Sequence, residues 1–291
     1  MHGWWQDLTD LVLPADCAGC GRPRTVLCPR CRAVLRGSGP RWVRPAPEPS
    51  GLPAVHAAAP YADEVRAVLL AHKERGALSL AAPLGAALAG AVLAGLRWAG
   101  LRWTGAVGAT AARGAGYGGV GPVLLVPVPS ARRAVRARGH DPARRIALAA
   151  AAELRRTGTP AGAPAVLRQR RAVADQAGLD SRQRQANLAG ALEVAPGGVR
   201  LLRRGPVVLV DDLMTTGASL TEAARAVSSA VYTARAREGM VLRNSGTRRG
   251  EEGNPMYGAS ERASAYGAGE VICAAVVASS PVSFGINTGT D

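Results

Sequence analysis

Short, continuous apolar runs alternate with longer helical patterns along this chain, and this alternation restricts the fold more than any other feature. Runs that are apolar throughout lie at residues 123–128, 207–210 and 271–277. Apolar residues recur at helical spacing in residues 146–154 and 219–227. Continuous apolar strands separated by helices are typical of βαβ units, in which helices cover both faces of a parallel sheet. The sequence therefore predicts an α/β fold with a parallel sheet flanked by helices.

One interval is too long for this pattern. About sixty residues separate Val210 from Val271, although a helix ending near Ala230 needs only a short connection to the next strand. Residues 231–265 are polar, rich in glycine and arginine, and without sustained periodicity. We therefore predict that residues 231–265 form an inserted, largely disordered loop.

Four of the five cysteines lie within fifteen residues, in two C-x2-C pairs. In a reducing compartment this spacing favours a tetrathiolate zinc site over disulfides, because the thiolates of both pairs can reach one tetrahedral ion. Such a zinc ion would be structural, since four thiolates leave no position for a reacting water. A redox dithiol and a remnant knuckle are the alternatives. The expected zinc ligands are Cys17, Cys20, Cys28 and Cys31, while the apolar neighbours of Cys273 predict a core residue.

Residues 1–50 are expected to form a segment of their own ahead of the main domain, residues 51–291. The segment begins with a Trp- and Leu-rich stretch at helical spacing, continues through the cysteines and ends in a Pro-rich linker at residues 37–53. Seven arginines and no acidic residue lie between Cys17 and Arg44, so this part presents a positive face. That face is either a solvated surface or a nucleic-acid binding surface.

The formal net charge of +15 identifies no partner by itself. Lys73 is the only lysine, and so strong a preference for arginine indicates the codon bias of a GC-rich genome. The N-terminus has no basic n-region and carries Asp7 and Asp10, so we expect a cytoplasmic protein without a secretory signal. Residues 78–96 are long and apolar enough to span a bilayer, but they consist mainly of alanine, glycine and leucine and include Pro83. We expect a buried or amphipathic helix there and no membrane span.

Two adjacent acidic residues, Asp211 and Asp212, directly follow the apolar run at residues 207–210. In a parallel sheet the ligand crevice lies at the carboxyl ends of the strands. Two carboxylates at a desolvated strand end repel each other, so they need cations or hydroxyl donors to stay ionised. The next residues open a helix, whose free N–H groups can hold a phosphate together with the local hydroxyls. This predicted phosphate cradle comprises Thr215, Thr216, Gly217, Ala218 and Ser219.

Other classes of protein also place acidic residues after an apolar strand. A nucleotide triphosphatase would need the pattern G-x-x-x-x-G-K-[ST], but the chain has no Gly-Lys pair. A signalling receiver with a phospho-acceptor aspartate would leave the Thr-Thr-Gly cradle unexplained, and an exposed turn capped by aspartate is the purely structural alternative. The acidic pair and its cradle together favour a site for sugar hydroxyls or Mg²⁺ beside a monophosphate.

The stretch VVLVDDLMTTGAS at residues 207–219 resembles the phosphoribosyl pyrophosphate signature of type I phosphoribosyltransferases, and the cysteine pairs resemble the competence protein F (ComF) family. Three more stretches, residues 61–76, 126–147 and 176–194, are similar to that family. Together they cover most of residues 10–230 and the final strand. The resemblance implies a type I phosphoribosyltransferase-like parallel sheet flanked by helices, with a small N-terminal zinc-knuckle segment.

The resemblance also implies roles for single residues. Asp211 and Asp212 would bind the 2′ and 3′ hydroxyls of the ribose, and Thr215 to Ser219 would bind its 5′-phosphate. The loop after the first long strand would hold pyrophosphate, with two prolines that stiffen its turn. This pyrophosphate loop comprises Pro127, Val128, Pro129 and Ser130.

Three cations and one loop complete the site that the resemblance implies. Lys73, Arg138 and Arg182 would contact pyrophosphate or the loop that covers it, or else be surface cations. Residues 170–187 match the mobile loop that excludes water from the activated sugar. His140 stands where this family usually has an aromatic residue, and we assign it no catalytic role.

The activity implied is Mg²⁺-dependent displacement of pyrophosphate from C1 of phosphoribosyl pyrophosphate by a nitrogen or carbon nucleophile. The sequence names neither the acceptor nor a general base. A hypothesis of another class is a non-catalytic adaptor that handles nucleic acid in DNA uptake or repair, with single-stranded DNA or competence and repair proteins as partners. It rests on the arginine-rich cysteine segment and on the name of the family.

Overall fold

The computed structural model describes residues 16–101, 121–173, 178, 180–244 and 269–285. Its centre is a six-stranded sheet with strand order β1-β2-β8-β7-β3-β4. The β1–β2 pair is antiparallel and every other neighbouring pair is parallel, so the α/β fold with a mostly parallel sheet is confirmed. The strands are β1 (Arg41–Val43), β2 (Val55–Pro60), β3 (Val123–Pro127), β4 (Ala161–Gly162), β7 (Val207–Met214) and β8 (Val271–Ser279).

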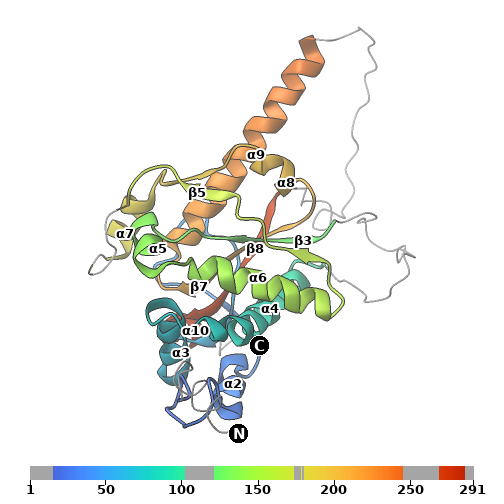
Figure 1. The fold of residues 1–291 in the computed structure, drawn as a ribbon. Helices are drawn as coiled ribbons and strands as arrows, with labels where there is room; N and C mark the ends of the chain where they lie inside the picture. The colour runs from blue at the N-terminus through green and yellow to red at the C-terminus, as the bar shows by residue number, and fades with distance from the viewer. Residues whose placement is uncertain (1–15, 102–120, 174–177, 179, 245–268, 286–291) are drawn as a thin grey trace, which may run out of the picture.

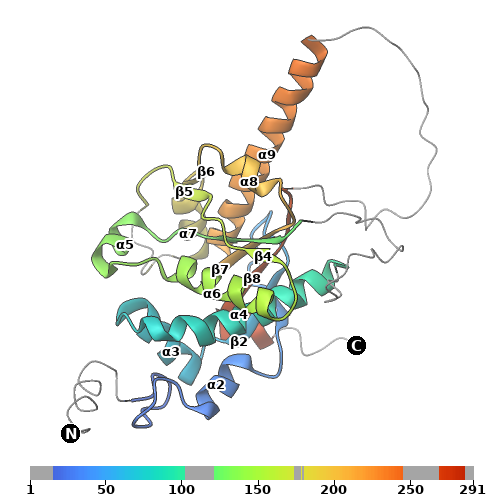
Figure 2. The ribbon, with the colours of Figure 1, turned by 45° about the vertical axis from the view of Figure 1, so that its right-hand side comes forward.

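Helices cover both faces of this sheet (Figures 1 and 2). On one face, α4 and α6 pack against each other and against the central strands, and on the other face α9 packs against β7 and β8. A small antiparallel sheet, β5 (Leu167–Gln169) with β6 (Leu192–Val194), also contacts α9. The helices are α2 (Pro29–Arg36), α3 (Asp63–Glu74), α4 (Ala81–Trp98), α5 (Arg132–Arg138), α6 (Pro142–Arg156), α7 (Ser181–Leu188), α8 (Gly198–Leu202), α9 (Ala218–Asn244) and α10 (Pro281–Gly285), with a 3-10 turn η1 at Leu78–Leu80.

The central strands are apolar throughout because each of their two faces is buried in a different hydrophobic cluster. Val208 and Val210 of β7 lie in the cluster under α4 and α6. Val207 and Leu209 lie in the cluster under α9. Successive side chains of a strand point to opposite faces, so burial on both faces requires the continuous apolar run seen in the sequence.

Helix α4 is packed inside the protein. With its preceding turn it is, among the described residues, the one segment long and apolar enough to cross a membrane, and 56% of that window is buried. Its small residues allow close contacts: a Cβ on Gly85 would lie 2.5 Å from the Cβ of Ala149, and one on Gly95 would lie 2.6 Å from Sγ of Cys273. The expected buried helix is confirmed, and Cys273 is fully buried as predicted.

The predicted loop at residues 231–265 is wrong for its first part, because α9 continues to Asn244 (Figure 1). Alanine, arginine, glutamate, methionine and leucine dominate this extension, and all of them have high helix propensity. Ion pairs from Arg203 to Glu238 and from Arg235 to Glu270 connect it to the domain. The remainder, residues 245–265, lies outside the described residues.

The interval predicted as a linker, residues 37–53, is partly built into the domain. Arg41–Val43 forms the edge strand β1, paired with β2. Cys28 and Leu35 of the preceding segment belong to the same hydrophobic cluster as the residues of α4. The cysteine segment therefore packs directly on the main domain, without a free connection between them. The helix expected near the N-terminus lies in residues 1–15, outside the described residues.

Candidate functional site

The four predicted zinc ligands come together. Their Sγ atoms all lie within 4.8 Å of one another, and Cys20 Sγ lies 3.6 Å from Cys28 Sγ. Two thiolates on one tetrahedral ion, each with a Zn–S bond of about 2.3 Å, are separated by about 3.8 Å. Cys17, Cys28 and Cys31 are buried and Cys20 is exposed. This cysteine cluster can hold one structural metal ion such as zinc.

Backbone N–H groups prepare two of these sulfurs to bind a cation. The amide of Cys28 donates to Cys17 Sγ at 3.3 Å, and the amide of Cys31 donates to Cys28 Sγ at 3.4 Å. Burial raises the pKa of Cys17, but the backbone donors outweigh it and lower the pKa to about 6. The bond from Cys31 lowers the pKa of Cys28. The backbone donors therefore stabilise the thiolate forms of Cys17 and Cys28, the form that a metal requires.

The acidic pair lies within β7 and does not follow it, because the strand extends beyond the apolar run at residues 207–210 as far as Met214. Asp211 is half-buried and Asp212 is buried. The Nζ of Lys73, on α3, donates to Oδ2 of Asp212 at 2.8 Å. Asp211 Oδ1 accepts a hydrogen bond from the amide of Asp212 at 2.9 Å. The pair is therefore held at the carboxyl-terminal half of a central strand with one cation beside it.

Burial and neighbouring charges shift the pKa of Asp211 and of Lys73. Burial raises the pKa of Asp211 well above its ordinary value, and the charge of Asp212 raises it further. Burial lowers the pKa of Lys73, but the charge of Asp212 more than offsets that effect and the net shift is upward. One ammonium thus compensates one carboxylate, and the other carboxylate needs a further cation or hydroxyl donors.

The predicted pyrophosphate loop lies beside the acidic pair. β3 pairs in parallel with β7, with Pro127 opposite Val210, and the amide of Val128 donates to the carbonyl of Val210 at 2.9 Å. The amide and hydroxyl of Ser130 each bond a different carboxylate oxygen of Asp141, both at 3.3 Å. Asp141 also caps α6, so the loop is fixed to the start of that helix.

The predicted phosphate cradle connects β7 to α9. Thr215 is exposed, Thr216 is half-buried, and α9 begins at Ala218. Gly217 has φ +77°, a left-handed conformation that favours glycine, and a Cβ there would lie 3.0 Å from both methyl groups of Leu52. Leu52 was not predicted to lie at this site, because residues 37–53 were assigned to a linker.

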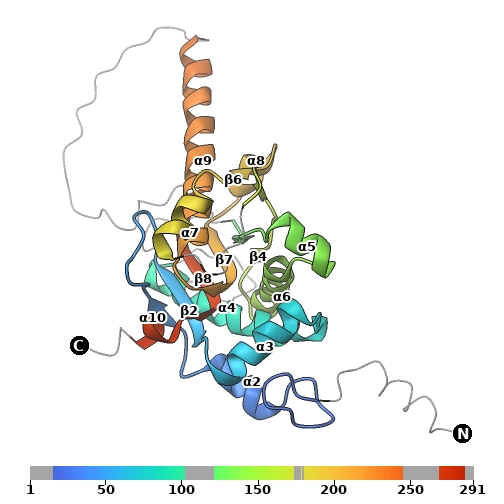
Figure 3. The same ribbon diagram turned by 90° about the vertical axis from the view of Figure 1, so that its left-hand side faces the viewer.

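Of the three predicted cations, the structure brings two together. Lys73 contacts Asp212, and Arg138 Nε donates to Glu74, next to Lys73 on α3, at 3.0 Å. Arg182 is exposed on α7, and no hydrogen bond or ion pair joins it to another described residue. Instead, Arg184 Nη1 donates to Oγ1 of Thr215 at 3.2 Å. Figure 3 shows α3, α5 and α7 around this end of the sheet.

The sequence contains a pattern that identifies Arg184. Asp180 and Gln183 form a capping box, the signature of a helix start, so residues from Ser181 on can be assigned to a helix. Arg184 and Leu188 are then four residues apart and share one face. Because the apolar Leu188 is buried, Arg184 also faces the protein, whereas Arg182 faces solvent.

His140 makes contacts between backbone segments. Its Nδ1 lies 3.1 Å from the carbonyl of Arg138, and its Nε2 lies 3.2 Å from the carbonyl of His72. The two imidazole rings are 5.8 Å apart, and burial lowers the pKa of His72. His140 thus joins α3 to the turn before α6, which accords with assigning it no catalytic role.

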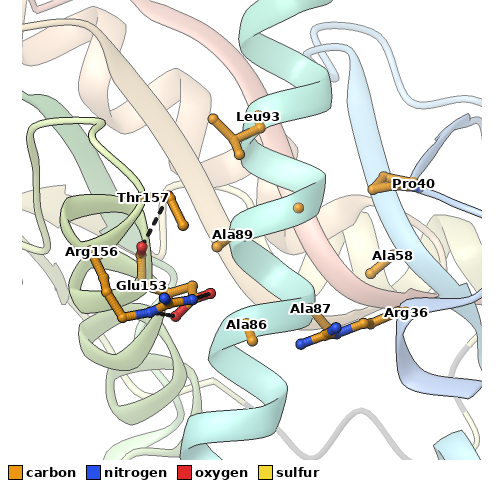
Figure 4. A pocket seen from close by; sticks show the side chains of 11 residues that line it. Arg36, Pro40, Ala58, Ala86, Ala87, Ala89, Leu93, Glu153, Arg156 and Thr157 are labelled. Carbon is orange, nitrogen blue, oxygen red and sulfur yellow. Dashed lines mark hydrogen bonds and ion pairs between the residues drawn. The ribbon is translucent and has the colours of Figure 1, made fainter. Parts of the chain in front are cut away.

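A separate pocket of about 400 Å³ lies between α2, α4 and α6 (Figure 4). Glu153 and Arg156, an ion pair on α6, line one side, and Arg36 of α2 lines the other. Glu153 lies twelve residues from Asp141, or about 18 Å along the helix. None of the predicted site residues lines this pocket.

No protein-family model matches the chain, and no curated protein matches it significantly.

Proposed function

We propose that this protein is a Mg²⁺-dependent phosphoribosyltransferase-like protein of the ComF type, which binds phosphoribosyl pyrophosphate. The observation that carries the proposal is the parallel pairing of β3 with β7. It sets the loop at residues 127–130 beside Asp211 and Asp212, immediately before the hydroxyl-rich start of α9. A type I phosphoribosyltransferase-like fold would use these three parts for pyrophosphate, ribose and 5′-phosphate.

The charges at this site fit such a ligand. Lys73 compensates Asp212, so Asp211 can accept hydrogen bonds from ribose hydroxyls or bind a cation. The start of α9 offers N–H groups and the hydroxyls of Thr215 and Thr216 to a phosphate. Within the described residues, the ion pairs include none that neutralises Asp211. This uncompensated carboxylate beside the ligand-binding loop fits a site for a divalent cation.

In the proposed reaction, the nucleophilic atom of the acceptor forms a bond to C1 of the ribose. The bond from C1 to the pyrophosphate oxygen breaks, its electron pair leaves with pyrophosphate, and the proton of the acceptor passes to solvent. Asp211 and Asp212 would hold the ribose, and the loop at residues 127–130 would lie against the leaving group. A bound Mg²⁺ would supply positive charge shared by pyrophosphate and ribose oxygens.

Calorimetric titration of the zinc-loaded protein with phosphoribosyl pyrophosphate tests this proposal. We expect binding that requires Mg²⁺ and that the double substitution Asp211→Asn with Asp212→Asn abolishes. Thermal unfolding of the double variant verifies that it is folded. Unchanged affinity in the folded double variant, or no binding by the wild-type protein, would overturn the proposal.

A second candidate function, binding of single-stranded nucleic acid, is favoured by an aromatic and arginine cluster at the edge strand β1. The rings of Trp42 and Trp98 are 6.1 Å apart, and the guanidinium of Arg44 lies 3.9 Å above the Trp42 ring. Trp98 is 51% exposed, so a base could stack on it. Quenching of tryptophan fluorescence by a thymidine oligonucleotide, lost in Trp98→Ala and weakened by salt, would support this function. No quenching at low salt would exclude it.

A further inference from the structure

Arg184, on α7, lies beside the segment that opens α9. Its Nη1 donates to the hydroxyl of Thr215, in the predicted phosphate cradle, at 3.2 Å. Its Nε is buried and has no hydrogen-bond acceptor in the described part of the chain. A buried N–H group without an acceptor costs free energy, and the cost is larger for a charged group. One N–H group of the guanidinium, the Nε–H, therefore has no acceptor among the described residues next to the cradle.

The structure fixes the direction in which Arg184 points. Asp180 and Gln183 cap the first turn of α7 reciprocally. Arg171 binds the carbonyls of Asn187 and Ala189 at the other end of the helix, at 2.9 and 2.8 Å. α7 also packs against α9. With both ends held, the face that carries Arg184 is set toward α9.

The described groups around the cradle already have partners, apart from one N–H of Arg184. Lys73 binds the buried Asp212, and Asp211 accepts a bond from the backbone. Thr215 accepts from one Nη atom of Arg184, while Nε has no acceptor among the described residues. A guanidinium beside threonine hydroxyls and the start of a helix suits the several oxygens of a phosphate.

We propose that Arg184 binds the terminal phosphate of a phosphorylated sugar in the cradle and makes the site specific for phosphorylated over free pentoses. This inference rests on the proposed function and extends it, because it assigns the phosphate to a cation on a different segment from the cradle. The sequence assigned Arg182 to pyrophosphate or the covering loop and assigned no role to Arg184.

Binding of ribose 5-phosphate to Arg184→Gln tests the inference. Ribose 5-phosphate has the terminal phosphate but no pyrophosphate, so it reports on the cradle alone. We expect Arg184→Gln to bind it at least tenfold more weakly and Arg184→Lys to recover part of the loss. Arg200→Gln removes one exposed positive charge from α8, away from this site, and should leave the affinity unchanged.

Mg²⁺-pyrophosphate is the second probe, and its affinity should stay within twofold of wild type in Arg184→Gln. That result also shows that the variant is folded. If Arg184→Gln binds ribose 5-phosphate as wild type does, or loses no more than Arg200→Gln, the role of Arg184 is overturned while the proposed function stands. If the wild-type protein binds neither ribose 5-phosphate nor phosphoribosyl pyrophosphate, the proposed function fails and this inference fails with it.

Discussion

The cysteine cluster and the site at the end of β7 are built in opposite ways. The four cysteines lie within fifteen residues of chain, and backbone amides from the same segment bond to their sulfurs. The site at the end of β7 takes groups from β3, β7, α3, α7 and the start of α9, which are distant in the sequence. The ion pair between Lys73 and Asp212 alone joins residues that are 139 positions apart.

The two regions also differ in how well their polar groups are compensated. A zinc ion bound by four thiolates would neutralise much of their negative charge and would leave no coordination position for a substrate. At the end of β7, two carboxylates share one nearby ammonium, and Arg184 has a buried N–H without an acceptor among the described residues. A site that is complete without a ligand stabilises the fold, whereas a site with unmet charges is suited to binding. Three substitutions test this contrast.

The largest effect is expected from Cys28→Ser. This change removes one of the expected zinc ligands, while serine can still cap α2, so most of the roughly 10 kcal/mol that a structural zinc contributes should be lost. We expect the wild-type protein to carry one zinc per chain by elemental analysis and the variant to carry almost none, with a lower unfolding temperature. Cys273→Ala alters the buried cysteine outside the cluster and should retain its zinc. A metal-free wild-type protein that forms disulfides in air would instead indicate a redox dithiol.

A smaller loss is expected from Lys73→Met. The substitution leaves Asp212 buried without its cation, and because the Lys73 side chain is 32% exposed we expect a loss of about 2 kcal/mol. The pKa of Lys73 is raised, so its contribution is complete below its ordinary value of 10.5 and disappears as pH rises through the folded-state value. Urea unfolding at pH 7 and above pH 11 measures both effects. In an Asp212→Asn background the same substitution should cost less, and an equal cost would show that the ion pair contributes nothing.

The smallest effect, and one of opposite sign, is expected from Asp211→Asn. Burial and Asp212 raise the pKa of Asp211, so the folded protein loses stability as pH rises from the ordinary value of 3.8 toward the folded-state value. At pH 7 the variant should therefore be more stable by about 1 kcal/mol in urea unfolding, and the difference should vanish below pH 4. Reduced stability at pH 7 would mean that Asp211 is compensated and would remove the contrast with the cysteine cluster.

Sequence patterns predicted the parts of the fold that depend on local chemistry. The apolar runs at β3, β7 and β8 were identifiable because both faces of each strand are buried. The C-x2-C spacing identified the cysteine cluster, because two short pairs place their thiols around one point. In the candidate site, the acidic pair and cradle were identifiable because they come soon after the apolar run at residues 207–210.

Other features could not be predicted from local pattern. The edge strand β1 has only three residues, and the prolines around it indicate a linker until β2 is known to lie beside it. The extension of α9 to Asn244 has good helix formers but little apolar periodicity, so its ion pairs with Arg203 and Glu270 were invisible in the sequence. Leu52 lies next to Gly217 only because the chain returns to that position in the folded protein.

By itself, the sequence determined the α/β class, the four-cysteine cluster and the strand that carries the acidic pair. Each of these depends on the spacing of residues within one segment, which the covalent chain sets. Only the tertiary structure decided that Lys73 neutralises Asp212 and that Arg184 reaches Thr215. Such contacts depend on how helices and strands from the whole chain pack to bury two hydrophobic clusters, and no single segment encodes that packing.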